Sequence, residues 1–346
     1  MSPMNPATIL GADWGKAAHK RAVWAADVHG RPCVRRLYRA AWTLPLLLEE
    51  AERLVRSDPV LVVLDVPLGV PQGYLAAVNR EAGLGATPTF IDLLTWTMTV
   101  PCFFNPTTDP RDWSLVRPFF VVAAGEGGRT AFDSAAAQLG VPSLLRQIDL
   151  QTNANRVFIT AGIPGSVGSS ACDIWMSLRT LLARPRSFAV WPFEGGLEEL
   201  NAKAVTVAEV YPRAAYATAL VDGAVRERRR LKLSKTDARC RYFAVQQLLG
   251  MRWVRYSRVR FEGMEWAREN EDDFDACVTA AALLRCCLEE LPFSQPLDFA
   301  TRAEGGILGS GSINLALGEA SYQPENLVRA AVKGAFLRNQ LRLGSQ

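Results

Sequence analysis

The spacing of apolar and polar residues over the first seventy positions predicts a series of strands interrupted by one helix. Residues 8–12 and 21–28 are short apolar runs, and residues 33–38 alternate between apolar and polar positions as a half-buried strand does. Residues 44–56 carry apolar side chains at helical spacing. The continuous apolar run at 60–64 is typical of a central strand that is buried on both faces.

Further regular elements are expected from residue 204 onwards, and helical stretches are expected near 134–139 and 171–183 within the segment before it. An apolar run at 204–210 predicts another strand, and helical spacing recurs at 235–249 and 272–290. The intervening segment is irregular and rich in proline, which is typical of an insertion rather than of a repeated core element.

This pattern predicts an α/β protein with one interrupted core. Residues 1–71 and 204–320 are expected to form the core, and residues 72–203 a large inserted cap. Residues 321–346 are expected to form a C-terminal helical tail.

Composition supports a globular protein with a sizeable core. Of the 346 residues, 49% are hydrophobic and 21% are charged, so the chain is not disordered. No apolar stretch reaches the roughly 18–20 residues that span a bilayer, so no membrane partner is expected. The N-terminus lacks a basic segment before an apolar one, and the seven cysteines lack metal-ligand spacing. We therefore expect a cytoplasmic protein with reduced thiols.

Histidine is too scarce to carry the chemistry of most hydrolases. The sequence contains only His19 and His29, which excludes a histidine-rich metal centre and leaves any Ser-His-Asp triad dependent on one of these two. Carboxylates are plentiful, with 35 Asp and Glu residues. If the protein is an enzyme, its chemistry is expected to rest on Asp and Glu.

Acidic residues stand at the ends of several otherwise apolar elements. Asp13, Asp65 and Glu209 end or follow predicted strands, and Asp272 and Asp275 lie on one face of a predicted helix. A single acid at such a place can simply cap a turn or a helix. Together they predict an all-oxygen site suited to Mg²⁺ or Mn²⁺, in which two ions about 4 Å apart can hydrolyse a phosphodiester.

The segments around these acids carry a resemblance to a known family. They read Gly-Ala-Asp-Trp-Gly at 11–15, Leu-Asp-Val-Pro-Leu-Gly at 64–69, Glu-Val-Tyr-Pro-Arg at 209–213, Asp-Asp-Phe-Asp-Ala at 272–276 and Glu-Gly-Gly-Ile-Leu-Gly at 304–309. In this order they resemble predicted nucleases with a ribonuclease H-like fold, known as domain of unknown function 429. The chain departs from that pattern at Gly306, where the family usually has Trp.

The resemblance implies a fold and a set of ligands. The fold is a mixed five-stranded sheet flanked by helices, with the first three strands antiparallel. Asp13 would bridge two metal ions, Asp65 and Asp275 would each hold one, and Glu209 or Asp272 would complete the shell. The start of the last helix is also similar to the final acidic motif of RuvC-type Holliday junction resolvases.

Positive charge is concentrated in one segment, although the net charge of the chain is only +4. Residues 226–260 contain twelve Lys and Arg against two acids, interleaved with Tyr242, Trp253 and Tyr256. This composition favours contact with DNA or RNA, although a solvated helix face explains it equally simply. The candidate contacts are Lys16, Arg228, Arg229, Arg230, Lys232 and Lys235.

Two other functions fit parts of the sequence. The segment 13–15 resembles the first phosphate motif of actin-like sugar kinases, and Gly305-Gly306 would then contact adenosine, but no second Asp-x-Gly loop follows. Alternatively, the chain is a nucleic-acid or partner-binding module with a vestigial site, in which the basic segment matters and the carboxylates do not.

Overall fold

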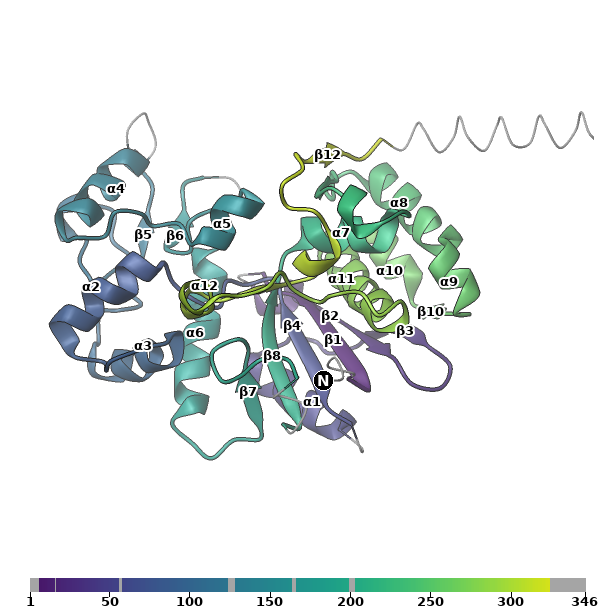
Figure 1. The fold of residues 1–346 in the computed structure, drawn as a ribbon, viewed down its shortest axis with the longest axis horizontal. Helices are drawn as coiled ribbons and strands as arrows, with labels where there is room; N and C mark the ends of the chain where they lie inside the picture. Colours follow the sequence, from purple (N-terminus) through teal and green to yellow (C-terminus); the bar gives the residue numbers. More distant parts are fainter. Residues whose placement is uncertain are drawn as a thin grey trace, which may run out of the picture.

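The fold is organised around one mixed sheet (Figure 1), which has eight strands where the resemblance implied five. The computed structural model describes residues 6–323, except 16, 56–57, 124–127, 164–165 and 199–202. The sheet runs β10-β3-β2-β1-β4-β8-β11, and β7 also pairs with β8. Its strands are β1 (Thr8–Asp13), β2 (Ala22–Asp27), β3 (Cys33–Leu37), β4 (Val60–Leu64), β7 (Phe188–Val190), β8 (Val205–Val210), β10 (Arg260–Glu262) and β11 (Ile307–Leu308).

Strand direction varies across the sheet, and the edge strand β10 lies parallel to β3. β1, β2 and β3 are antiparallel neighbours, whereas β4 lies parallel to β1, and β8 lies parallel to β4. The outer side of β8 is shared, because β7 pairs with its first half and β11 with its second half. The carboxyl ends of β1, β4 and β8 therefore meet at one edge of the sheet.

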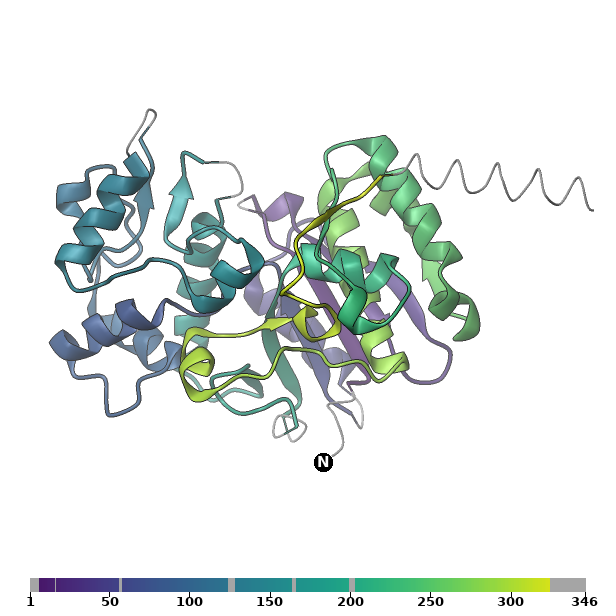
Figure 2. The same cartoon turned by 45° about the horizontal axis from the view of Figure 1, so that its top comes forward.

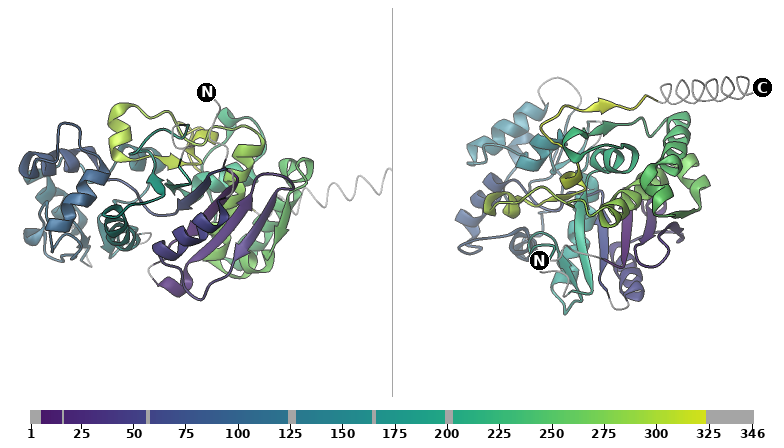
Figure 3. Two further views of the ribbon diagram at one scale, coloured as in Figure 1. Left: turned by 90° about the horizontal axis from the view of Figure 1, so that it is seen from below. Right: turned by 45° about the vertical axis from the view of Figure 1, so that its right-hand side comes forward.

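Helices cover both faces of the sheet, as Figure 3 shows, and this confirms the predicted α/β class. On one face, α11 (Glu271–Leu288) packs on β1 and β2 and against α7 (Pro212–Leu220). On the other face, α1 (Leu44–Leu54) packs on β4 and against α6 (Gly168–Leu182). Alternate residues of β4 enter the two cores, which explains its continuous apolar sequence.

A close approach between β1 and α11 requires glycine at position 11. A Cβ atom added at Gly11 would lie 2.8 Å from the carbonyl oxygen of Ala276 and 2.9 Å from the backbone nitrogen of Ala280. The small residues of α11 thus let the helix lie almost directly on the strand. This contact brings the first turns of α11 to the end of β1 that carries Asp13.

The inserted segment forms the second lobe seen in Figures 1 and 2. Its main elements are α2 (Gln72–Ala82), α3 (Phe90–Trp96), α4 (Gly128–Gln138), α5 (Gln147–Thr152) and the strand pair β5 (Phe120–Val121) and β6 (Ile159–Ala161). Its last part returns to the core, because α6 packs against α1 and β7 joins the central sheet. The core therefore begins again before residue 204.

The remaining elements lie mainly in the last third of the chain. The helices predicted at 235–249 and 272–290 are present as α8 (Ala238–Gly250) and α11. They are accompanied by α9 (Arg252–Tyr256), α10 (Met264–Glu269), α12 (Phe299–Glu304) and the pair β9 (Leu231–Lys232) and β12 (Ala320–Ser321). Short 3-10 helices occur at Ala18–Lys20, Thr97–Thr99, Pro110–Asp112, Val225–Glu227 and Ser310–Ser312.

Two expectations concern the chain's ends and membranes. Of the helical tail predicted at 321–346, Ser321 belongs to β12 instead, residues 322–323 follow without regular structure, and the rest lies outside the described residues. In the described part of the chain, no helix is both long enough and apolar enough to cross a membrane.

Candidate active site

The carboxyl ends of β1 and β4 bring two of the predicted acids together. Asp13 is the last residue of β1, and Asp65 follows β4, where its backbone N–H donates to the carbonyl of Ala12 over 3.1 Å. Asp275, on the second turn of α11, faces the same edge because Gly11 lets that helix approach β1. All three acids line one cavity of about 510 Å³. These three acids thus line the same cavity, although 262 positions separate the first from the last.

A lysine occupies the centre of this acid cluster. Lys235, between β9 and α8, forms an ion pair with Oδ2 of Asp275, and its Nζ lies 3.9 Å from Oδ2 of Asp13. The Tyr216 hydroxyl, from α7, donates to Oδ1 of Asp275. Oδ2 of Asp13 is buried and has no hydrogen-bond partner among the described residues. One oxygen in the cluster thus remains available to a further cation.

The environment disfavours negative charge on these acids. Burial raises the pKa of Asp13 well above its ordinary value, and the charge of Asp275 raises it further. Burial likewise raises the pKa of Asp65 to about 7, although Lys235 lowers it. The pKa of Asp275 is also raised by burial, with Lys235 and Tyr216 acting in the opposite direction. The cluster therefore needs positive charge to remain ionised.

Lys235 supplies part of that charge. Burial acts to lower its pKa, but Asp275, Asp13 and Asp65 outweigh this effect and raise it. The ammonium group is consequently charged at neutral pH. Asp272 is not among the residues that line the cavity. It is partly buried, which raises its pKa, while Lys235 and a hydrogen bond with Asp13 act against the rise.

The donor set is chemically suited to Mg²⁺ or Mn²⁺, because it consists of carboxylate oxygens. The carboxylates of the described residues do not, however, surround a common point at which an ion could bind. Within the described ranges, no three Asp, Glu, His or Cys side chains are grouped so that they could hold a metal. The ammonium of Lys235 instead lies among the acids, where a metal ion would otherwise balance their charge.

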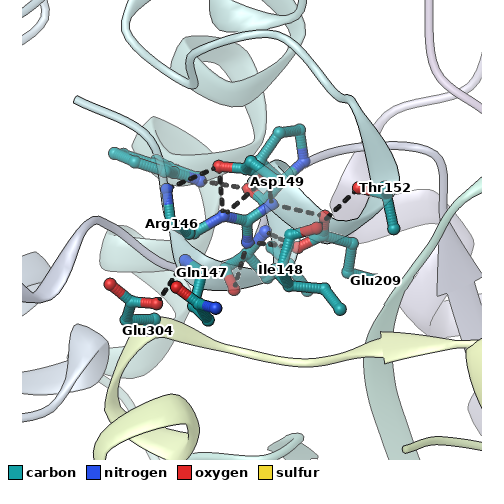
Figure 4. A network of polar contacts seen from close by, with 10 residues as sticks. Arg146, Gln147, Ile148, Asp149, Thr152, Glu209 and Glu304 are labelled. Atoms are coloured by element: carbon teal, nitrogen blue, oxygen red, sulfur yellow. Dashed lines mark hydrogen bonds and ion pairs between the residues drawn. The ribbon is translucent and has the colours of Figure 1, made fainter. Parts of the chain in front are cut away.

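Glu209 has a partner that the sequence did not predict. Nη1 and Nη2 of Arg146 donate to Oε2 and Oε1 of Glu209, each over 2.7 Å, and the backbone N–H of Leu68 also donates to Oε2 over 2.7 Å. The same guanidinium contacts Asp149, so that Arg146 lies between the two acids (Figure 4). Glu209 lines the cavity, but in this arrangement both its oxygens already accept strong hydrogen bonds.

The predicted basic contacts are dispersed by the fold. Arg228 is wrong as a polymer contact, because it is buried, donates to the carbonyl of Ser312 and lies 4.0 Å from Glu289. Arg229 and Lys232 are exposed, whereas Arg230 is half-buried and donates to the carbonyl of Gln151. Lys235 belongs to the acid cluster, and Lys16 lies outside the described residues.

The aromatic residues of the basic segment also divide into two groups. Trp253 is wrong as a stacking residue, because it is buried and its indole N–H donates to the carbonyl of Ala219. Tyr242 and Tyr256 are exposed. Arg146, Tyr216 and the central position of Lys235 had no local signal in the sequence, because each contact joins segments at least 40 positions apart.

The comparisons with known proteins add no relative. No family model matches the chain, and neither a curated protein nor a solved structure matches it. The resemblance to domain of unknown function 429 therefore rests on the motifs and stays a prediction.

The Arg146 network gives a direct test of how the insertion is held to the sheet. In Arg146→Met, Glu209 and Asp149 remain buried without their cation, so unfolding should become easier by about 3–5 kcal/mol. Urea unfolding followed by tryptophan fluorescence measures the change. Arg111→Met is the control, because Arg111 pairs with Asp109 on the surface and its loss should have no measurable effect. Equal effects of the two variants would contradict this account.

Proposed function

We propose that this protein is a metal-dependent nuclease that hydrolyses phosphodiester bonds of DNA or RNA. The observation that carries the proposal is the meeting of Asp13, Asp65 and Asp275 in one cavity, with a buried oxygen of Asp13 left without a hydrogen-bond partner among the described residues. Buried acids with raised pKa values need a cation, and clustered carboxylates are typical ligands of the ions that catalyse phosphoryl hydrolysis.

The arrangement of the sheet supports the same proposal. The order β3-β2-β1-β4-β8, with the first three strands antiparallel and the last two parallel to β1, agrees with a ribonuclease H-like core. The acids stand at the carboxyl ends of its parallel strands, where α/β sheets commonly bind their ligands. This agreement concerns the fold, and the site's chemistry carries the functional argument.

The acids are not grouped around an ion while Lys235 is paired with Asp275, so a metal ion would have to displace this ammonium. Asp13, Asp65 and Asp275 are then the residues that would hold Mg²⁺ or Mn²⁺, with Asp272 beside them. Bound ions would neutralise the phosphate and lower the pKa of a water molecule. The protein's own groups prepare the site: the Tyr216 hydroxyl orients Asp275, and Lys235 keeps the acids together while no ion is bound. Both DNA and RNA fit this chemistry.

Residues of both the core and the inserted segment line the cavity beside the acids. Arg213 and Tyr211 contribute from the core, and Asn153 and Ser166 contribute from the inserted segment. A nucleic-acid strand bound at the acids would therefore contact the insertion as well as the sheet. We also propose a cytoplasmic location, where cysteines stay reduced.

Replacing the acids tests the mechanism. With Mn²⁺ or Mg²⁺, the purified protein should cleave a labelled structured DNA or RNA, and Asp13→Asn or Asp65→Asn should slow cleavage by about 100-fold or more, because several kcal/mol of charge stabilisation are lost. Asp109→Asn, at a half-buried position of the insertion that pairs with Arg111, is the matched control and should cleave normally. Cleavage that persists in the double variant Asp13→Asn/Asp65→Asn would rule out this mechanism.

Replacing Lys235 tests whether the ammonium competes with a metal ion. Lys235→Met should bind Mn²⁺ about 10-fold more tightly in isothermal titration calorimetry, because the ion no longer displaces a positive charge. Lys232→Met is the control: the same substitution at an exposed position three residues away should leave the affinity unchanged. Equal or weaker Mn²⁺ binding by Lys235→Met would show that the ammonium does not occupy the ion's place.

The two other functions give different results in these assays. A binding module would bind nucleic acid without metal and without cleavage, and Asp65→Asn would not affect it. An actin-like phosphotransferase would be stabilised against heat by ATP.

A further inference from the structure

A second cavity, separate from the acid cluster, has five arginines among its twelve lining residues. It has a volume of about 650 Å³ and lies where β10, α9 and α10 meet, at the right of Figure 1. We call it the arginine hollow and define it by Arg31, Arg255, Arg258, Arg260 and Arg268. Glu265 is the only acid among its lining residues in the described structure.

The positive charge of the arginine hollow is largely unbalanced. Arg260 pairs with Glu262 over 3.1 Å, but Arg31, Arg255 and Arg258 form no ion pair with any described residue. The Nε atom of Arg268 is buried and has no hydrogen-bond partner in the part of the chain that the structure describes. The guanidinium carbon of Arg268 lies 5.6 Å from the ring centre of Tyr242. Several arginines around one hollow repel each other, and an anion with several acceptor oxygens relieves that repulsion.

The backbone holds one of these arginines in a conformation that favours glycine. Arg258 follows the end of α9 with a φ of 52°, and the N–H of Val259 donates to the carbonyl of Val254 over 3.0 Å to close the turn. Glycine is the usual residue at such a helix end, because a side chain there costs about 1 kcal/mol. The chain thus has a guanidinium group where the local backbone alone would favour glycine.

An exposed aromatic ring adjoins the hollow. Tyr256 is 79% exposed, and the guanidinium carbon of Arg252 lies 5.7 Å from its ring centre. A smaller hollow of about 360 Å³, lined by Arg252, Arg255 and Tyr256, shares Arg255 with the arginine hollow. A free ring beside several arginines is typical of sites where a base stacks while the phosphates on either side are neutralised. An acidic protein or a lipid headgroup would not need that ring.

Strand register separates the hollow from the acid cluster. Arg260 pairs with Cys33, Cys33 with Asp27, and Asp27 with Thr8, which is the first residue of β1, whereas Asp13 is the last. Five residues along β1 span about 17 Å, and three strand spacings span about 14 Å, so the two sites are roughly 20 Å apart. The arginine hollow is thus a separate site and not part of the wall of the acid-lined cavity.

We propose that the arginine hollow and Tyr256 form a second nucleic-acid-binding site, which holds the sugar-phosphate backbone of a single strand with one base stacked on Tyr256. The identity of the polymer rests on the proposed nuclease function, but the site does not require cleavage. It anchors a strand at the end of the sheet opposite the acids.

Fluorescence anisotropy with a labelled single-stranded 20-mer, in EDTA, tests this site without cleavage. Arg255→Gln/Arg258→Gln should weaken binding about 10-fold and reduce the slope of log affinity against log salt by about 1.4, as two lost phosphate contacts predict. Tyr256→Ala should weaken binding about 10-fold with little change in that slope, because stacking is not ionic. Circular dichroism melting checks that each variant is folded.

The controls separate a local contact from net charge. Arg53→Gln/Arg111→Gln removes the same charge from two arginines whose side chains are 73% and 89% exposed elsewhere, and it should bind like the wild type. Equal loss in both arginine pairs, or normal binding by the hollow variants, would overturn the proposal. Binding of the wild type to anionic vesicles but not to the oligonucleotide would also overturn it.

The outcome is distinguishable from that of the nuclease proposal. If Asp13→Asn abolishes cleavage while the hollow variants bind normally, the nuclease proposal stands and this site is refuted. If the hollow variants lose binding while no polymer is cleaved, this site stands without nuclease activity.

Discussion

Buried negative charge at one edge of the sheet is the constraint on which the other features depend. Asp13, Asp275 and Glu209 are each less than 8% exposed, and removing several carboxylates from water costs several kcal/mol each. Two cations from distant segments offset that cost: Lys235 for the two aspartates and Arg146 for Glu209. The charges of these acids are therefore balanced only when the core, the β9–α8 connection and the inserted segment have folded together.

The same constraint fixes the insertion against the core. Arg146 comes from the insertion and reaches Glu209 on β8, so a cavity wall is held by a buried ion pair. Glu304, just before β11, accepts hydrogen bonds from the backbone nitrogens of Gln72 and Gln147 over 2.8 and 2.6 Å, and so ties the starts of α2 and α5 to the core (Figure 4). Hydrogen bonds thus connect the insertion to the residues beside the acids, and such connections favour a preorganised site.

The sequence could predict the features that depend on neighbouring residues, but not the contacts between residues far apart along the chain. Apolar periodicity predicted β1, β4 and α11. Acids at the ends of such elements indicated Asp13, Asp65 and Asp275 as site residues, because burying a carboxylate costs free energy unless it is paired or bound to a cation. β7 and β11 are too short to show a period. Arg228 contacts Glu289, which lies more than 60 positions away, and Lys235 pairs with Asp275 in the acid cluster. Composition alone could not predict that these two residues differ from the exposed basic residues beside them.

A crystal soaked in Mn²⁺ and measured at the manganese absorption edge tests the central claim most directly, because it locates the cation without relying on activity. The account predicts anomalous density between Asp13, Asp65 and Asp275, with the ammonium of Lys235 moved away from Asp275. An unchanged Lys235–Asp275 ion pair with no manganese at the three acids, in a crystal where the ion had free access to the cavity, would contradict it.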